Sequence, residues 1–268
     1  MSEIKSTNNV NIIPAMINSE IIFPETESDD ESLFLKEEQK PNGILEDFNQ
    51  DKLGDCGLIS TLISFKNSET GSKIIKDAIS ETNNGHSVYF KGINKAIEIT
   101  SKELEEAMKS GYAKGKDNGI ADSDAVLLEL AFEKVCDEKP SSLMRFKHIV
   151  NDIFSKLHLA EDKYENQKSI VAESPYYFME LLTGKKSKMV TNFIGDFSST
   201  DRILNKLQDK DFVACISFGS DDRGHVLSIK SIDDENAVLI NPWNINEEIT
   251  VKREELLKAE RIEYMIFN

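Results

Sequence analysis

The stretch Gln50-Asp51-Lys52-Leu53-Gly54-Asp55-Cys56-Gly57 places a thiol where a loop is expected to become a helix. Apolar residues follow at helical spacing: Leu58, Ile59, Leu62, Ile63 and Phe65. The N–H groups and positive dipole end at the start of a helix favour an anion, and a thiolate is the nucleophilic form of cysteine. Gly54 supplies backbone freedom and Asp55 is the expected N-cap. The pattern therefore indicates a position for a cysteine nucleophile.

Two later segments offer a base and an amide. His225 begins an alternating run that follows Gly224 and predicts a strand. A second apolar strand ends at Asn241, and residues 231–236 can form a hairpin between the two. Such a hairpin brings His225 and Asn241 to the same end of a sheet. The Asn241 amide can then orient the imidazole, and His225 can take the proton of Cys56.

Taken together, these motifs resemble the calpain-like cysteine proteases, a branch of the papain-like fold. The resemblance rests on Gln50-x-x-Leu53-Gly54-Asp55-Cys56, on Gly224-His225 at a strand start, and on Asn241-Pro242-Trp243. Residues 124–134 and 179–184 are similar to further family segments, and the landmarks keep the family order over residues 46–268.

The resemblance implies roles for individual residues. Cys56 would be the nucleophile, His225 the general base and acid, and Asn241 the orienting amide. Gln50 would donate to the oxyanion together with the Cys56 backbone N–H, and Trp243 would shield the His225–Asn241 hydrogen bond. Gly54, Asp55 and Gly224 would support the site. Taken singly, each of these residues also has an ordinary structural explanation, such as a buried thiol, a strand histidine or a turn asparagine.

The sequence also departs from the family pattern. Gly57 stands where the family has tryptophan, which is expected to widen the cleft, and Asn244 replaces a glycine. Residues 245–250 lack the tryptophan-rich acidic stretch linked to calcium in animal members. We therefore expect no calcium requirement, no metal site and no cofactor.

The charge and the hydrophobic pattern of the sequence exclude some classes of partner. The formal net charge of −16 argues against nucleic-acid binding. No apolar run of 18 residues and no secretory signal is evident, so no membrane span is expected. Cys136 and Cys215 lie in apolar patterns and are expected to be buried thiols. A reducing, cytoplasmic compartment is expected, with delivery into a host cell as an alternative. The oligomeric state stays open.

The chain is expected to divide into an acidic tail and a catalytic domain. Residues 1–50 contain 11 acidic and 3 basic side chains, and residues 1–44 are interpreted as a largely disordered segment that masks the cleft or serves as a delivery signal. Residues 45–268 predict an α+β, papain-like fold, with a helical subdomain over 45–190 and an antiparallel β subdomain over 191–268. Expected helices cover the Cys56 segment, 72–81, 102–108, 124–136, 142–157 and 176–182. Expected strands cover 87–90, 96–99, 212–218, 225–232, 237–240, 248–251 and 263–267.

The expected activity is cleavage of protein substrates through a thioester intermediate. The same three residues can also perform deamidation or transamidation of a protein, and a catalytically silent binding module is a third possibility. Lysine exceeds arginine by 27 to 5, which suggests an AT-rich bacterial genome and, by analogy, a bacterial effector.

Overall fold

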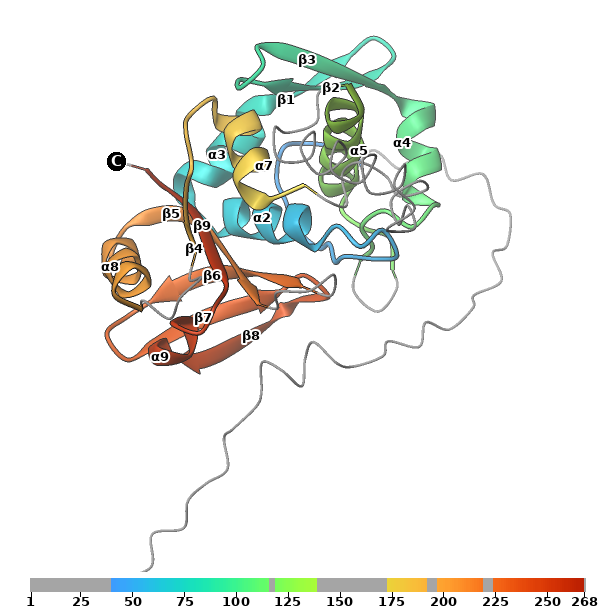
Figure 1. Ribbon diagram of the computed structural model, residues 1–268. Helices are drawn as coiled ribbons and strands as arrows, with labels where there is room; N and C mark the ends of the chain where they lie inside the picture. Colours follow the sequence, from blue (N-terminus) through green and yellow to red (C-terminus); the bar gives the residue numbers. More distant parts are fainter. Residues whose placement is uncertain (1–39, 116–118, 139–172, 192–196, 219–223, 268) are drawn as a thin grey trace, which may run out of the picture.

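The protein combines a helical half with an antiparallel sheet half. The computed structural model describes residues 40–115, 119–138, 173–191, 197–218 and 224–267. Helices and a small sheet come first along the chain, and a larger sheet follows (Figure 1). The α+β class expected from the sequence is confirmed. None of the helices described here is long and apolar enough to span a bilayer.

The helical half contains five described helices and a three-stranded sheet. The helices are α2 (Cys56–Asn67), α3 (Glu69–Ala78), α4 (Ser101–Met108), α5 (Ser123–Glu138) and α7 (Pro175–Thr183), and the strands are β1 (Ile79–Thr82), β2 (Gly85–Phe90) and β3 (Lys95–Thr100). The C-terminal end predicted for the helix over 72–81 was wrong. It stops at Ala78 because Ile79 pairs with Val88 in the sheet. The helix expected over 142–157 lies outside the described residues.

The second half is a six-stranded antiparallel sheet of order β4-β9-β5-β6-β7-β8. Its strands are β4 (Lys188–Thr191), β5 (Asp211–Phe218), β6 (His225–Ile232), β7 (Asn236–Asn241), β8 (Asn244–Lys252) and β9 (Arg261–Phe267). The subdomain boundary expected at 190 falls inside β4, which belongs to this sheet through its pairing with β9. Two helices that were not expected, α8 (Phe197–Leu207) and α9 (Arg253–Leu256), accompany the sheet.

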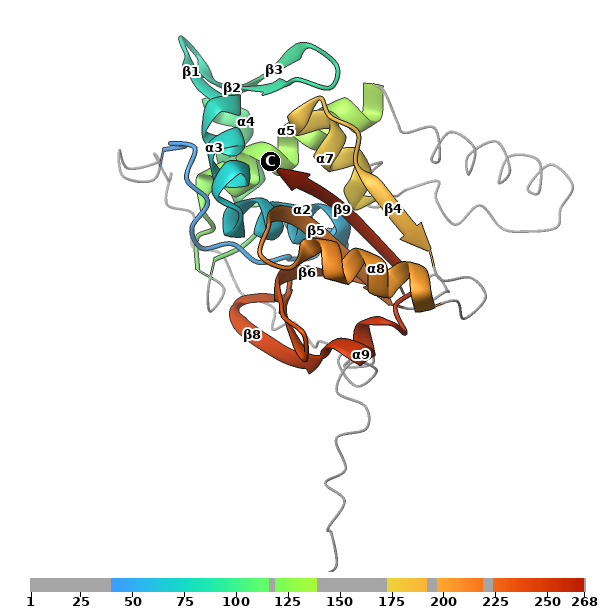
Figure 2. The ribbon, with the colours of Figure 1, turned by 90° about the vertical axis from the view of Figure 1, so that its left-hand side faces the viewer.

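The large sheet separates two hydrophobic cores. Along β5, Val213 and Cys215 join the core of the helical half. Ala214 and Ile216 join a second core, which also contains Leu204 of α8. This alternation is the two-residue period of a strand buried on both faces. The sheet is therefore covered by α2 on one face and by α8 and α9 on the other, as the two views show (Figures 1 and 2).

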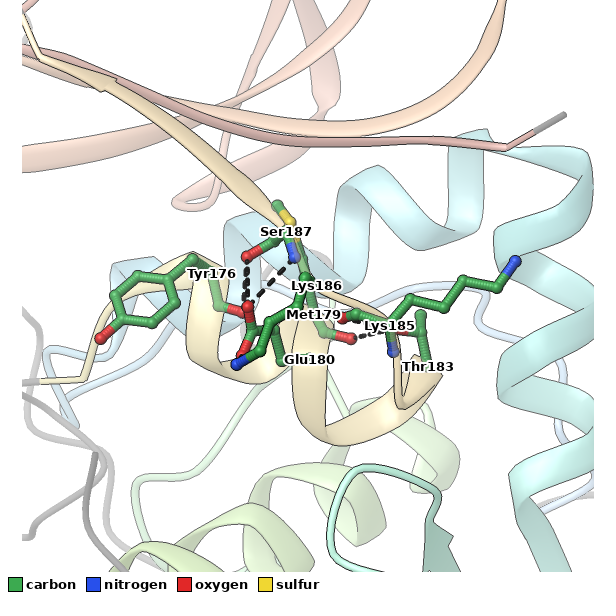
Figure 3. Close-up of polar contacts among 7 residues, drawn as sticks. All are labelled: Tyr176, Met179, Glu180, Thr183, Lys185, Lys186 and Ser187. Carbon is green, nitrogen blue, oxygen red and sulfur yellow. Dashed lines mark hydrogen bonds and ion pairs between the residues drawn. The ribbon is translucent and has the colours of Figure 1, made fainter. Parts of the chain in front are cut away.

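Helix α7 ends in the turn that leads to the sheet. The Gly184 N–H donates to Glu180 O at 2.9 Å, and φ of Gly184 is +67°, a left-handed C-cap. The Ser187 N–H donates to the Glu180 carboxylate at 3.1 Å, and the Thr183 hydroxyl donates to Met179 O at 2.7 Å (Figure 3). These contacts fix the direction in which the chain enters β4.

Part of the segment expected to be a disordered tail belongs to the folded body. The Asp124 carboxylate, at the start of α5, accepts hydrogen bonds from the N–H groups of Asn42 at 2.9 Å and Gly43 at 2.7 Å. Asp122 N donates to Asp47 O at 2.9 Å. The boundary expected at residue 44 was therefore too late, because a buried carboxylate holds residues 42 and 43 in place.

Candidate active site

Cys56 is the first residue of α2. The preceding Gly54 has φ of +68°, a left-handed conformation that glycine adopts without steric cost. Asp55 occupies the N-cap position, and its backbone oxygen accepts from Leu58 N at 2.9 Å. The expected N-cap residue is confirmed, although its side chain makes no capping hydrogen bond. As a whole residue, Cys56 is partly exposed at the helix start.

His225 and Asn241 form a hydrogen-bonded pair. His225 begins β6, Asn241 ends β7, and His225 Nε2 lies 3.0 Å from Asn241 Oδ1. Because an amide oxygen only accepts, this bond places a proton on Nε2. The neutral ring then carries its lone pair on Nδ1. The adjacent strands thus bring together the two residues that the sequence placed at one end of a hairpin.

Trp243 completes this pair from the turn between β7 and β8. Its ring stacks on that of His225, with 4.2 Å between centroids and 27° between planes. Its backbone N–H donates to Asn241 Oδ1 at 3.1 Å. The pairing of β7 with β8 shifts register between Ile240 and Asn241, where this tight turn begins. The amide oxygen therefore receives two donors, and the imidazole is held against an aromatic face.

The contact of α2 with β6 brings Cys56 to the strand of His225. Ser60 Oγ, one helical turn after Cys56, donates to Val226 O at 2.8 Å. The Val226 main chain is also a hydrogen-bond partner of the Cys56 thiol. Val226 directly follows His225, so one residue of β6 joins the thiol to the strand that carries the imidazole. Sequence reasoning did not single out Ser60, although Ser60 and Ser64 repeat at helical spacing on one face.

Gln50 lies beside the Asn241 turn. Its backbone N–H donates to Pro242 O at 2.8 Å, and its side chain is buried. Its Oε1 has no hydrogen-bond partner among the described residues. Because rotation of the amide exchanges oxygen and nitrogen, the same position can present the NH2 donor to an incoming group.

Asn49 anchors this segment and was missed by sequence reasoning. Its Oδ1 accepts from Ile245 N at 2.8 Å in β8. Its backbone pairs with Lys114, through Lys114 N to Asn49 O at 2.9 Å. Gln50 is therefore held between the helical half and the sheet half. No local sequence signal marks a buried asparagine with such distant partners.

Burial changes the ionisation of both candidate catalytic groups. Desolvation raises the pKa of Cys56 to about 11, although backbone hydrogen bonds from Val226, Gly57 and Cys56 itself lower it, and the nearby Asp55 charge also raises it. Desolvation lowers the pKa of His225 from 6.5, partly opposed by the hydrogen bond to Asn241. This shift runs against the thiolate expected at the helix start, because the loss of solvent outweighs the backbone hydrogen bonds. At neutral pH the pair is a thiol and a neutral imidazole.

The space beside Gly57 is filled by the entry to α7. A Cβ at residue 57 would lie 3.1 Å from Glu173 O and 3.5 Å from Pro175 Cδ. A side chain larger than that of alanine at residue 57 would therefore meet Glu173 and Pro175, which already lie beside this position. Gly224, the other glycine of the site, is exposed immediately before β6.

A buried carboxyl group supports the same region. Glu263 of β9 is 1% exposed, and desolvation raises its pKa to about 7. Ser174 and the backbone of Tyr176, at the start of α7, lower this pKa, as does Arg261, whose Nε lies 3.2 Å from Oε1. Sequence reasoning missed Glu263, although an acidic residue inside an apolar strand run is a usable signal.

The other two cysteines are buried, as expected. Cys136 and Cys215 are both 0% exposed, and burial raises the pKa of each thiol far above its ordinary value. Among the described residues, no group of three or more His, Cys, Asp or Glu side chains is arranged to hold a metal ion.

Comparison with known proteins assigns no family. No protein-family model matches the chain, and no curated protein matches it.

Proposed function

We propose that this protein is a calpain-like cysteine endopeptidase of papain-like fold, with Cys56 as nucleophile, His225 as general base and acid, and Asn241 as orienting amide. One observation carries the proposal. His225 and Asn241 are joined by a hydrogen bond of 3.0 Å, and the Trp243 ring stacks on the His225 ring. Val226, the residue after His225 in β6, is a backbone hydrogen-bond partner of the Cys56 thiol. A nucleophile, a base and an orienting group in this order are the parts required for acyl transfer.

Because the Cys56 thiol and the His225 imidazole are both neutral, the first step we propose combines proton transfer with nucleophilic attack. The Cys56 thiol attacks the substrate carbonyl carbon while Nδ1 of His225 takes the thiol proton. The oxyanion that forms accepts hydrogen bonds from the Cys56 N–H and the Gln50 amide. The C–N bond breaks, and His225 gives its proton to the leaving amine. Water, deprotonated by His225, then hydrolyses the thioester and regenerates the thiol.

The test is incubation of the full chain with a proteome, followed by mass spectrometry of new N-termini. A peptidase produces new termini, whereas a deamidase produces side chains heavier by about 1 Da and a transamidase produces cross-linked or amine-modified side chains. We expect new termini, and we expect Cys56→Ala, His225→Ala and Asn241→Ala to remove or strongly reduce them.

Matched variants distinguish a loss of cleavage from a loss of folding. Cys56→Ala should leave the melting temperature nearly unchanged, because it removes a single sulfur atom from a partly exposed residue. Gln50→Ala should slow cleavage, while Gln208→Ala, at a glutamine that follows α8, should not. Cleavage that persists in Cys56→Ala would overturn the assignment of the nucleophile. Side-chain mass changes without new termini would replace the peptidase by a deamidase.

A further inference from the structure

A concave surface in the helical half is lined by lysine as its only charged residue type. It has a volume of about 370 Å³ and lies between α3 and the segment before Gln50. We call it the lysine groove, and its lining residues are Gly43, Ile44, Leu45, Lys66, Ser72, Lys73, Ile75 and Lys76. In a chain of net charge −16, such a surface attracts acidic ligands.

The floor of the lysine groove is apolar. Ile44, Leu45 and Ile75 line it; Leu45 and Ile75 are buried, and the Ile44 residue as a whole is 50% exposed. A ligand for this surface therefore needs apolar side chains for the floor as well as acidic side chains for the rim. An inorganic anion would leave the exposed face of Ile44 uncovered.

The three lysines of the groove differ in their contacts and in their exposure. Lys66 donates to Glu46 O and lies 5.8 Å above the Phe48 ring, and burial lowers its pKa. Lys73 and Lys76 are exposed and lie about one turn apart on α3, so both project from the same face of the helix. These two lysines form the rim that faces an incoming ligand.

We propose that residues 29–38 of the same chain dock in the lysine groove. This segment reads Asp29-Asp30-Glu31-Ser32-Leu33-Phe34-Leu35-Lys36-Glu37-Glu38, with three apolar residues between two acidic groups. The apolar group matches the floor, and the flanking carboxylates match Lys73 and Lys76. The proposal concerns an interaction surface and does not depend on the peptidase activity.

The place where the described chain begins supports this occupant over an external partner. The described residues begin at Lys40, and Gly43 and Ile44 already line the groove. Phe34 is nine residues before Gly43, a tether that reaches at most about 30 Å when extended. Such a short tether gives an effective concentration on the order of millimolar, so weak contacts suffice for docking.

The test is zero-length carbodiimide cross-linking of the full chain, which joins carboxylates to amines in direct contact. A mixture of isotope-labelled and unlabelled chains distinguishes links within one chain from links between chains. We expect links within one chain from Glu37, Glu38 or residues 29–31 to Lys73 or Lys76. Phe34→Asp should reduce their yield about tenfold, because burial of a phenylalanine contributes more than this factor.

Variants that exchange the charges of the groove and of the docking segment test whether the cross-links depend on charge pairing. Lys73→Glu with Lys76→Glu should abolish the links, and adding Glu37→Lys with Glu38→Lys should restore links of reversed polarity. The matched control is Lys206→Glu with Lys210→Glu, at two exposed lysines of α8 and the turn after it. Links that spread evenly over surface lysines, that join two chains, that start from Glu25 or Glu27, or that survive Phe34→Asp would each overturn the proposal.

Discussion

The thiol of Cys56 and the imidazole of His225 are both held in neutral forms by burial. In the reaction we propose, this arrangement favours transfer of the thiol proton to His225 during the attack over a resident thiolate–imidazolium pair. A cysteine with a pKa of about 11 has little thiolate at neutral pH, so its reactivity with small alkylating agents depends strongly on pH.

We therefore expect iodoacetamide to modify Cys56 with a rate that rises about tenfold per pH unit between about pH 7 and 10. Cys56 should react before Cys136 and Cys215, which are both 0% exposed. Peptide mass spectrometry at several times and pH values measures all three rates. A rate that reaches its plateau near neutral pH would instead indicate a thiolate–imidazolium pair.

Gly57 provides a test of the packing against α7. Gly57→Trp should destabilise the protein by about 3 kcal/mol or more, because an indole ring would displace Glu173 and Pro175. Gly57→Ala should cost far less, since its Cβ lies 3.1 Å from a single carbonyl oxygen. Denaturant unfolding of the two variants measures both effects. Equal stabilities would contradict the close contact.

Glu263 makes the stability of the protein depend on pH. Its folded pKa of about 7 exceeds the ordinary 4.5, so the native state binds the proton more tightly than the unfolded state. The free energy of unfolding should therefore fall as pH rises from about 4.5 to 7, by at most about 3 kcal/mol from this group. Glu263→Gln should flatten this fall, whereas Glu248→Gln, at an exposed position, should not. Unfolding curves across this pH range decide the matter.

Among the elements, helix α2 makes polar contacts with the sheet through two serines. Ser60 donates to Val226 O, and Ser64 Oγ accepts from Ala214 N at 2.8 Å and donates to Ala214 O at 3.2 Å. These hydroxyl groups join backbone groups that strand pairing leaves available. They explain why a helix with an apolar sequence pattern still carries serines on the face toward the sheet.

Ser64→Ala should lower the free energy of unfolding by about 1 to 3 kcal/mol, because it leaves the buried Ala214 N–H without this partner. Ser80→Ala, at an exposed position of β1, is the control and should change stability by less than about 0.5 kcal/mol. A loss of equal size in both variants would contradict the role given to the helix–sheet hydrogen bond.

Most of the described helices and strands could be predicted from the sequence because their patterns are local. Strand β6 begins at His225 and ends at Ile232, as alternation predicted. The end of α3 could not be predicted, since Ile79 leaves the helix to pair with Val88. The pairing of His225 with Asn241 followed from a hairpin. The neutral thiol and the filled space at Gly57 depend on burial and on a distant segment, which a local pattern does not reveal.

At the scale of the whole molecule, the activity we propose should not depend on calcium. Residues 245–250 lack the acidic, tryptophan-bearing stretch linked to calcium in animal calpain-like proteases, and they form part of β8. Titration with a chelator should leave the cleavage rate within about twofold, since no bound cation would be lost. A strong requirement that calcium restores would contradict this expectation.

The attachment of α2 to β6 also determines how such a molecule can be controlled. The thiol and the imidazole come from two elements that share one hydrogen-bonded interface at Val226. Folding of α2 onto β6 therefore brings Cys56 to the strand that carries His225. For the activity we propose, control would therefore act on substrate entry or on the amount of protein present.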